Sequence, residues 1–346
     1  MNTSFERFLQ LSKADRSDVF TAAAQRLGTL PSYIEKDFWV SLVLDALYNG
    51  LPAGHPRLLF KGGTSLSKAF GIIRRFSEDI DIVVFRNDLG FSDERDPAGT
   101  STNLSRKKRA QLFEELKITC GDYIVDKLAP ALGAILDGLQ TKCRVMAADA
   151  DRHTLLVEYP SVFDADGLSY VLPRVKIESG ARSALDPNSK CQIRPYIADE
   201  LADWKFSVGG ITTIDPARTY WEKLLMLHGT HCGYRDEGRL PTDRDRISRH
   251  YYDVAMISET DIGQNAIQDH ELWAAVREHN LIAFRQAWKK FDEAVAGSTH
   301  IIPQQALRTE IEKDYAAMQG MILGDAPDFS WIIKRLEEVE EAINRT

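Results

Sequence analysis

Residues 60–85, FKGGTSLSKAFGIIRRFSEDIDIVVF, are the most informative part of the sequence for its fold. A short apolar run ends in a Gly-Gly-Thr turn, a helical pattern follows, and residues 80–85 have the apolar character of a second buried strand. Because side chains alternate along a strand, Asp79 and Asp81 project from one face, while the apolar residues between and after them can pack into a core from the other face. The stretch therefore predicts a strand, a glycine turn, a helix and a strand that carries two neighbouring carboxylates.

These residue types point to a metal and a nucleotide. Two adjacent carboxylates repel each other unless a cation neutralises them, and Mg²⁺ is usually held by one or two carboxylates together with nucleotide phosphates. The turn Gly62-Gly63-Thr64 would let the backbone approach an anion, and the next helix would offer its N-terminus to a phosphate. An isolated Asp-x-Asp could be a solvated strand face and the glycine pair an ordinary turn, but their order favours a binding site. The sequence has neither a P-loop nor a Rossmann glycine motif, so another phosphate-binding fold is expected.

Helical patterns flank this unit on both sides. The first fifty residues have helical periodicity, further strands are predicted at Thr154 to Tyr159 and Tyr170 to Glu178, and Asp215-Pro216 is a favourable helix start. From there to the C-terminus the pattern is almost wholly helical. We therefore expect an α+β fold, with a small mixed sheet and N-terminal helices in residues 1–210 and a C-terminal helical domain in residues 211–346.

Composition narrows the class of protein. The 346 residues contain 43 Lys and Arg against 51 Asp and Glu, a formal net charge of −8, which argues against a protein that coats nucleic acids without specificity. The basic run at residues 106–109 could contact phosphates or could be a solvated helix face. The N-terminus lacks the apolar core of a signal peptide, and no stretch is long and apolar enough to cross a membrane. We expect a cytoplasmic protein.

Cysteine and histidine spacing gives little sign of a structural metal. The four cysteines are widely spaced, without a zinc or disulfide pattern. The stretch HGTHC, residues 228–232, has no fourth zinc ligand at a suitable spacing. We interpret it as the end of a helix at Gly229.

At the level of motifs, residues 60–85 resemble the signature of the AbiEii-type nucleotidyltransferase toxins, within the DNA polymerase β-like nucleotidyltransferase superfamily. Three further segments follow the family's order: IEKDFWV with Glu35, Lys36 and Asp37, RTYWEKLLMLH with Glu222 and Lys223, and RHYYDVAMI with Arg249 and Asp253. The resemblance thus covers most of the chain. The signature reads Gly-Gly-Thr-x-Leu and then Arg-x-Ser-x-Asp-x-Asp, matched without departure by Gly62, Gly63, Thr64, Leu66, Arg75, Ser77, Asp79 and Asp81.

The resemblance implies a nucleotidyltransferase fold and the transfer of a nucleoside monophosphate from an NTP. It also implies tRNA as the acceptor and a cognate antitoxin as a partner. By this analogy Asp79 and Asp81 would bind Mg²⁺ or Mn²⁺, Ser77 and Lys223 would contact the triphosphate, and Asp253 would be a further essential acid.

Several of these residues have a plainer alternative. Superfamily members commonly complete the metal site with an acid from a neighbouring strand, and Lys176 and Glu178 share one face of a predicted strand. Glu178 could therefore bind the metal and Lys176 the triphosphate, or the two could form an ion pair. Lys223 could be a surface lysine whose stem covers apolar residues, and Asp253 could pair with Arg249 one helical turn earlier.

We therefore expect a Mg²⁺-dependent nucleotidyltransferase that modifies RNA and acts as the toxin of a toxin–antitoxin or phage-defence pair. Two alternatives remain open: a small-molecule nucleotidyltransferase of the antibiotic-modifying kind, and a non-catalytic module that binds nucleotide or RNA.

Overall fold

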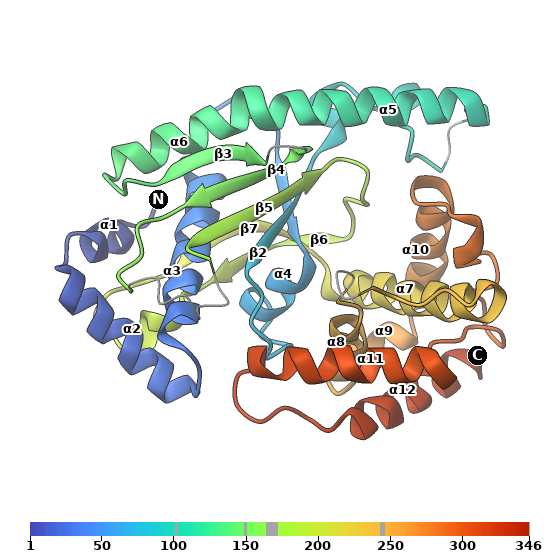
Figure 1. Cartoon of the computed structure of the whole chain (residues 1–346). Coiled ribbons are helices and arrows are strands. Elements are labelled where there is room, and N and C mark those ends of the chain that lie inside the picture. The colour runs from blue at the N-terminus through green and yellow to red at the C-terminus, as the bar shows by residue number, and fades with distance from the viewer. Residues whose placement is uncertain (101–102, 149–150, 164–171, 243–245, 346) are drawn as a thin grey trace. The chain divides into compact units, whose positions relative to one another are not determined.

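The computed structural model describes residues 1–100, 103–148, 151–163, 172–242 and 246–345 (Figure 1). The chain separates into two compact units. Unit 1 comprises residues 1–69 and 76–214, and unit 2 comprises residues 70–75 and 215–346. The sequence predicted a division after residue 210. The second unit begins at Asp215 and also contains the short segment 70–75, which interrupts the first unit.

Backbone pairing explains why residues 70–75 belong to unit 2. The amide of Leu323 donates a hydrogen bond of 2.7 Å to the carbonyl oxygen of Arg74, and Arg75 forms an isolated antiparallel bridge with Ile322. This pairing joins positions almost 250 residues apart in the sequence, so no local pattern could have predicted it.

Unit 1 is built on a mixed sheet that has seven strands in the described part of the chain, in the order β3-β4-β5-β2-β1-β7-β6. β1 and β2 are antiparallel, whereas β2 pairs with β5 and β1 pairs with β7 in parallel. The α+β class is therefore confirmed. The strand predicted at 154–159 lies largely in β4, and the strand predicted from residue 170 overlaps β5, although residues 170 and 171 lie outside the described residues. The strands are β1 (Leu58–Lys61), β2 (Asp79–Val84), β3 (Arg144–Ala148), β4 (Asp151–Glu158), β5 (Arg174–Gly180), β6 (Asn188–Ile193) and β7 (Val208–Ile214).

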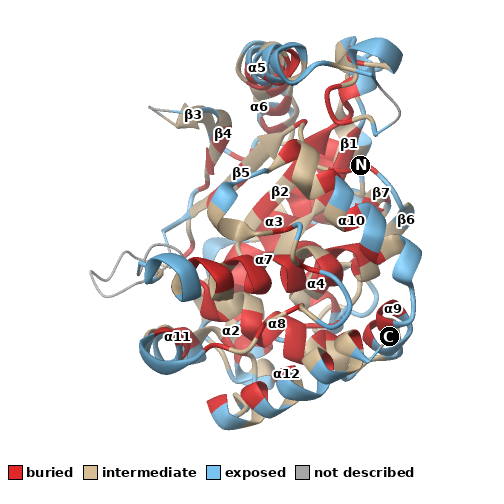
Figure 2. Ribbon diagram, turned by 90° about the vertical axis from the view of Figure 1, so that its right-hand side faces the viewer, coloured by how far each residue is buried: buried red, intermediate tan, exposed pale blue. Residues whose placement is uncertain are grey.

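The helices of unit 1 cover the sheet. α3 packs against β2, β5 and β7, and the side chains along nearly its whole length are buried. α5 packs against β4 and β5, and α6 against β3. Figure 2 shows buried residues concentrated in the central strands and on the inward faces of the helices. The helices are α1 (Thr3–Leu9), α2 (Lys13–Leu27), α3 (Pro31–Asp45), α4 (Gly62–Lys68), α5 (Arg106–Tyr123) and α6 (Ala129–Gly138), and π-helical turns at Ala46–Gly50 and Ile124–Leu128 continue α3 and α5.

Unit 2 is helical. Asp215 caps its first helix by accepting a hydrogen bond of 2.8 Å from the amide of Ala217, and Pro216 occupies the first helical turn. No helix among the described residues is long and apolar enough to cross a membrane. The helices are α7 (Pro216–Glu237), α8 (Ser248–Ser258), α9 (Asp261–Ile267), α10 (His270–Ala283), α11 (Gln305–Met318) and α12 (Phe329–Asn344).

The helix end predicted at Gly229 is wrong. α7 continues to Glu237 and ends at Gly238, whose φ of 63° is the left-handed conformation of a C-cap. Gly229 lies inside the helix, where a Cβ would come within 3.2 Å of the Lys289 side chain. The glycine therefore permits close packing, which a sequence pattern cannot distinguish from a helix stop.

Candidate functional site

The two aspartates of β2 lie on the face that the alternation predicted. Ile80 and Ile82 are buried, while Asp79 and Asp81 are half-buried. The parallel pairing of β2 with β5 places Asp79 opposite Lys176 and Asp81 opposite Glu178. The sheet thus brings the four predicted charged residues into two adjacent pairs, although they come from strands about a hundred residues apart in the sequence.

The glycine turn is fitted closely to one of these carboxylates. Gly62 has a φ of +79°, and a Cβ at this position would lie only 1.9 Å from Oδ2 of Asp81. Any larger residue would therefore be strained and would also collide with the carboxylate. α4 begins at this glycine, and its N-cap residue, Lys61, makes no side-chain capping hydrogen bond. The turn is thus in close contact with an acid.

Thr64 is hydrogen-bonded to the segment at which β2 begins. Its side chain is fully buried, and its hydroxyl is hydrogen-bonded to the hydroxyl of Ser77 at 2.8 Å and to the carbonyl oxygen of Asp79. Ser77 is half-buried. The Thr64 hydroxyl is thus engaged inside the protein, where it orients Ser77.

Carboxylates outnumber cations around β2. Burial raises the pKa of Asp79, and the neighbouring charges of Glu78 and Glu178 raise it further, against the lowering effect of Lys176. Burial lowers the pKa of Lys176, but Glu178 and the two aspartates outweigh that effect and raise it overall. A site in which acids repel one another in this way favours the uptake of a cation.

Asp79 and Asp81 fit a hard divalent cation that takes its remaining ligands from water and phosphate. Among the described residues, no group of three His, Cys, Asp or Glu side chains is placed to hold a metal ion. Glu178 accepts a hydrogen bond from the ammonium group of Lys176. The structure contains the ion pair, which uses one carboxylate oxygen of Glu178 and leaves the other oxygen to be considered as a metal ligand.

Asp253 lies in unit 2 and is the partner of two cations, Arg75 and Lys223. The Asp253 carboxylate is fully buried and accepts two hydrogen bonds from Arg75, at 2.7 and 2.8 Å. Nζ of Lys223 lies 2.9 Å from Oδ2 of Asp253 and 3.1 Å from Nδ1 of His250. Lys223 is therefore buried and paired, not a surface lysine, and Asp253 binds Arg75 and Lys223, whereas the sequence had left a pair with Arg249 open as an alternative.

This cluster has a surplus of positive charge. Although burial raises the pKa of Asp253, Arg75 and Lys223 hold that pKa well below its usual range. Burial lowers the pKa of Lys223, and nearby Arg75 and Arg249 lower it further, against the opposing effect of Asp253. Burial and the Lys223 charge lower the pKa of His250, so that its imidazole is neutral and Nδ1 can accept a hydrogen bond from Lys223.

The family model described as "Nucleotidyl transferase AbiEii toxin, Type IV TA system" matches residues 45–343. The chain belongs to this family. It is a nucleotidyltransferase and a toxin of the type IV toxin–antitoxin class. The AbiEii chain is also similar to a solved structure of MenT4, a nucleotidyltransferase toxin from Mycobacterium tuberculosis, at 17% sequence identity and a TM-score of 0.44, covering 96% of this chain and 98% of that one. No curated protein matches it.

The residue of the AbiEii signature whose role sequence reasoning missed is Arg75. The signature contains this arginine, but its partner Asp253 is 178 positions away, and the only sequence signal was that each residue belongs to a family motif. Arg75 lies in unit 2, whereas Ser77, two residues later, lies in unit 1. The signature is therefore the point where the chain passes from the Asp253 cluster to the strand that carries Asp79 and Asp81.

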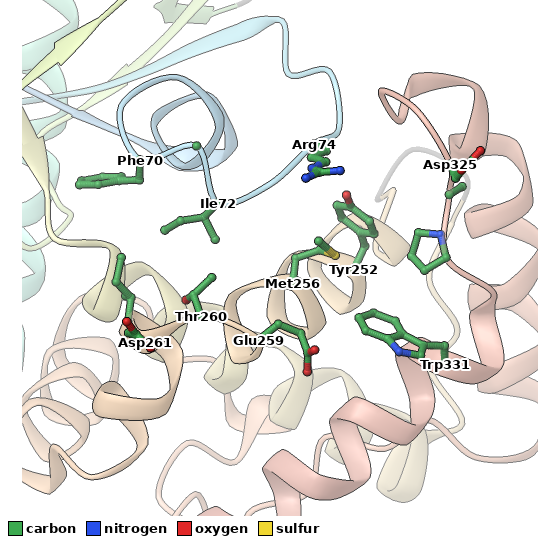
Figure 3. Close-up of a pocket in the computed structure, with 14 residues that line it drawn as sticks. Phe70, Ile72, Arg74, Tyr252, Met256, Glu259, Thr260, Asp261, Asp325 and Trp331 are labelled. Atoms are coloured by element: carbon green, nitrogen blue, oxygen red, sulfur yellow. The ribbon is translucent and has the colours of Figure 1, made fainter. Parts of the chain in front are cut away.

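Unit 2 of this AbiEii protein also contains a pocket of about 700 Å³ (Figure 3). In Figure 3, Phe70, Ile72 and Arg74 come from the segment 70–75, Tyr252 comes from α8 and Trp331 comes from α12. Its volume is within the range of small-molecule sites. None of the site residues predicted from the sequence, all of which are described, lines this pocket.

Proposed function

We propose that this protein transfers a nucleoside monophosphate from an NTP to an RNA acceptor, with tRNA as the expected class, and that the reaction depends on Mg²⁺ or Mn²⁺. The observation that carries the proposal is the contact between Gly62 and Asp81. A glycine turn, whose backbone can approach a phosphate, lies against a carboxylate that is suited to a cation. Such a combination would bind a metal–triphosphate complex.

Each residue of unit 1 has a distinct part in this proposal. Asp79 and Asp81 would hold the metal, which when bound stabilises charge on the transferred phosphoryl group. Ser77, held beside Thr64, would turn its hydroxyl hydrogen toward a phosphate oxygen when nucleotide binds. The backbone at Gly62 and Gly63 would approach the phosphates. Phosphoryl transfer needs mainly positioning and charge neutralisation, and these residues can supply both.

Lys176 and Glu178 are proposed to assist the binding of the triphosphate and the metal. Lys176 is half-buried and would contribute positive charge toward the triphosphate. Glu178 would be a third metal ligand through the carboxylate oxygen that does not accept from Lys176. We assign the metal principally to the two aspartates, because they share one face of β2 and Asp81 lies against the glycine turn.

We propose that Lys223 contacts the triphosphate and that Asp253 anchors the cations. A lysine ammonium group has three donor hydrogens, and Asp253 and His250 take two of them, which leaves one for a phosphate oxygen. Asp253 is fully buried and its pKa is held low, so it remains ionised and is unsuited to transferring protons. Its loss would impair the reaction through Arg75 and Lys223.

The proposed acceptor is supported by the first turn of α5. Its four residues, 106–109, are all basic and the turn contains no acid. Arg106, Lys107 and Lys108 are exposed. Positive charge at a helix N-terminus is unfavourable for the helix, and a phosphate backbone would offset it. The proposed setting is cytoplasmic, in a toxin–antitoxin or phage-defence pair with a cognate antitoxin as partner.

Labelled nucleotides test the proposal. The purified protein is incubated with Mg²⁺, total RNA and each α-³²P-labelled NTP in turn, and the RNA is resolved on a denaturing gel. The expected result is label in a tRNA-sized band with at least one NTP. Label only in small molecules would favour the antibiotic-modifying alternative. Nucleotide binding without any transfer would favour the non-catalytic alternative.

A further inference from the structure

Three consecutive charged residues, Glu35, Lys36 and Asp37, lie on the buried helix α3. They are only 2%, 4% and 3% exposed. Burying a charge is costly unless a partner compensates for it. The triplet also lies before residue 45, where the family match begins, so that match assigns it no role.

Each member of the triplet binds a different segment of unit 1. Glu35 accepts hydrogen bonds from the Ser161 hydroxyl at 2.6 Å and the Val162 amide at 2.8 Å. Asp37 accepts from Nζ of Lys68 at 2.6 Å and from the Tyr196 amide at 2.7 Å. Lys36 donates to the carboxylate of Glu78 and, at 3.5 Å, to the carbonyl oxygen of Leu172. Glu35 thus holds the loop at 161–162, Asp37 holds α4 and the 3-10 turn that begins at Tyr196, and Lys36 reaches the candidate site.

The partner of Lys36 stands between two proposed functional residues. Glu78 follows Ser77 and precedes Asp79, and its side chain is 20% exposed. When its carboxylate is held by Lys36, the backbone from which Ser77 and Asp79 project is fixed. The same bond places the ammonium group of Lys36 against the carboxylate of Glu78, and the pKa of Asp79 is raised by Glu78 and lowered by Lys36.

We propose that Lys36 is a positioning residue of the metal–nucleotide site, acting through Glu78 on Ser77 and Asp79. The inference rests on the proposed function, because it assigns Lys36 a part in presenting those two side chains to the metal and the phosphates. An apolar residue would fill a buried helix position at lower cost than a lysine. The ion pair with Glu78 explains why a charged residue occupies this buried position.

Lys36→Met tests the inference, because methionine has a similar length and no charge. The expected result is a fall of about tenfold or more in kcat, since small displacements of reacting groups have effects of this size. The KM for NTP and the affinity for Mn²⁺, measured by electron paramagnetic resonance without RNA, should stay within about threefold of the wild-type values, because Asp79 and Asp81 remain. Lys36→Arg keeps the cation and should restore kcat to within about threefold.

A double variant tests the route through Glu78. Glu78→Met should reduce kcat as Lys36→Met does, and the double variant should be no worse than the poorer single variant, since both break one bond. If Lys36→Met does not fold, Glu78→Met removes the same bond from its more exposed side. Losses that multiply in the double variant would overturn the inference, as would an unchanged kcat in Lys36→Met or Glu78→Met.

A matched control separates positioning from stability. Arg86 donates a hydrogen bond of 2.8 Å to Asp96, with side chains 10% and 18% exposed, in the same unit. Arg86→Met should lower the melting temperature and leave kcat unchanged. If the wild-type protein itself transfers no nucleotide, the proposed function fails. If it transfers and Lys36→Met transfers equally well, only the inference about Lys36 fails.

Discussion

Replacing Gly62 with alanine should stop nucleotidyl transfer at a small cost in stability. A Cβ at position 62 would lie 1.9 Å from Oδ2 of Asp81, well inside van der Waals contact, so the carboxylate must move away. The φ of +79° adds strain for alanine, and left-handed backbone costs about 1–2 kcal/mol. For a chain of 346 residues that strain corresponds to a fall in melting temperature of roughly 1–3 °C. Activity should fall much further, because a proposed metal ligand is displaced.

The assay compares Gly62→Ala with Gly90→Ala. Gly90 has a φ of +85° and open space where its Cβ would lie, so its variant carries the strain without the collision. We expect similar melting temperatures for the two variants. Transfer of label from α-³²P-NTP should fall by about a hundredfold or more in Gly62→Ala and stay near wild type in Gly90→Ala. Equal activity in the two variants would refute the role given to the contact between Gly62 and Asp81.

Three further predictions concern the lysines proposed to contact NTP, the buried acid Asp253 and the lysines of α5. Lys223→Ala should lower kcat/KM for NTP by about a hundredfold, which is the scale of a charge-assisted contact in a dry site. Lys176→Ala should lower kcat/KM less. If steady-state kinetics show the larger loss in Lys176→Ala, the role given to Lys223 is contradicted. Asp253→Asn should destabilise the fold by about 3–5 kcal/mol at neutral pH, because buried cations lose their partner. The pKa of Asp253 is depressed in the folded protein. The ionised carboxylate therefore contributes fully to the free energy of unfolding above the ordinary Asp pKa of about 4, and this contribution is lost as pH falls below that value. The difference in melting temperature between wild type and Asp253→Asn should therefore shrink in acid, and a constant difference would contradict this. Lys107→Glu combined with Lys108→Glu should raise the KM for RNA and flatten its salt dependence without changing the KM for NTP; an unchanged KM for RNA would exclude α5 as its docking surface.

The sequence was most informative where the structure depends on local periodicity. The alternation in β2 predicted which side of the strand carries Asp79 and Asp81, and the buried isoleucines between and after them confirm it. The helix start at Asp215 also followed from local chemistry, because capping involves only neighbouring residues. These features need no knowledge of what packs against them.

Features that depend on distant partners could not be predicted. Glu178 had two interpretations because its neighbours depend on the order of the strands. The parallel pairing of β2 with β5 places Glu178 beside Asp81, and its carboxylate is bonded to Lys176. Likewise, a spacing of one helical turn made Arg249 a reasonable partner for Asp253, whereas the buried carboxylate is bonded to Arg75 from the segment that joins unit 2. Burial and long-range pairing, not local spacing, decided both contacts.

Asp81→Asn tests whether β2 carries the metal, because the substitution keeps the size of the side chain and removes one proposed metal ligand. Mn²⁺ binding and transfer of label from α-³²P-NTP to RNA are measured on the same preparation, with circular dichroism to confirm folding. We predict that Mn²⁺ affinity and transfer fall together, with the transfer rate below about a tenth of wild type, given the several kcal/mol that metal charge stabilisation supplies. A folded Asp81→Asn protein that binds Mn²⁺ and transfers nucleotide at the wild-type rate would contradict the claim that β2 carries the metal.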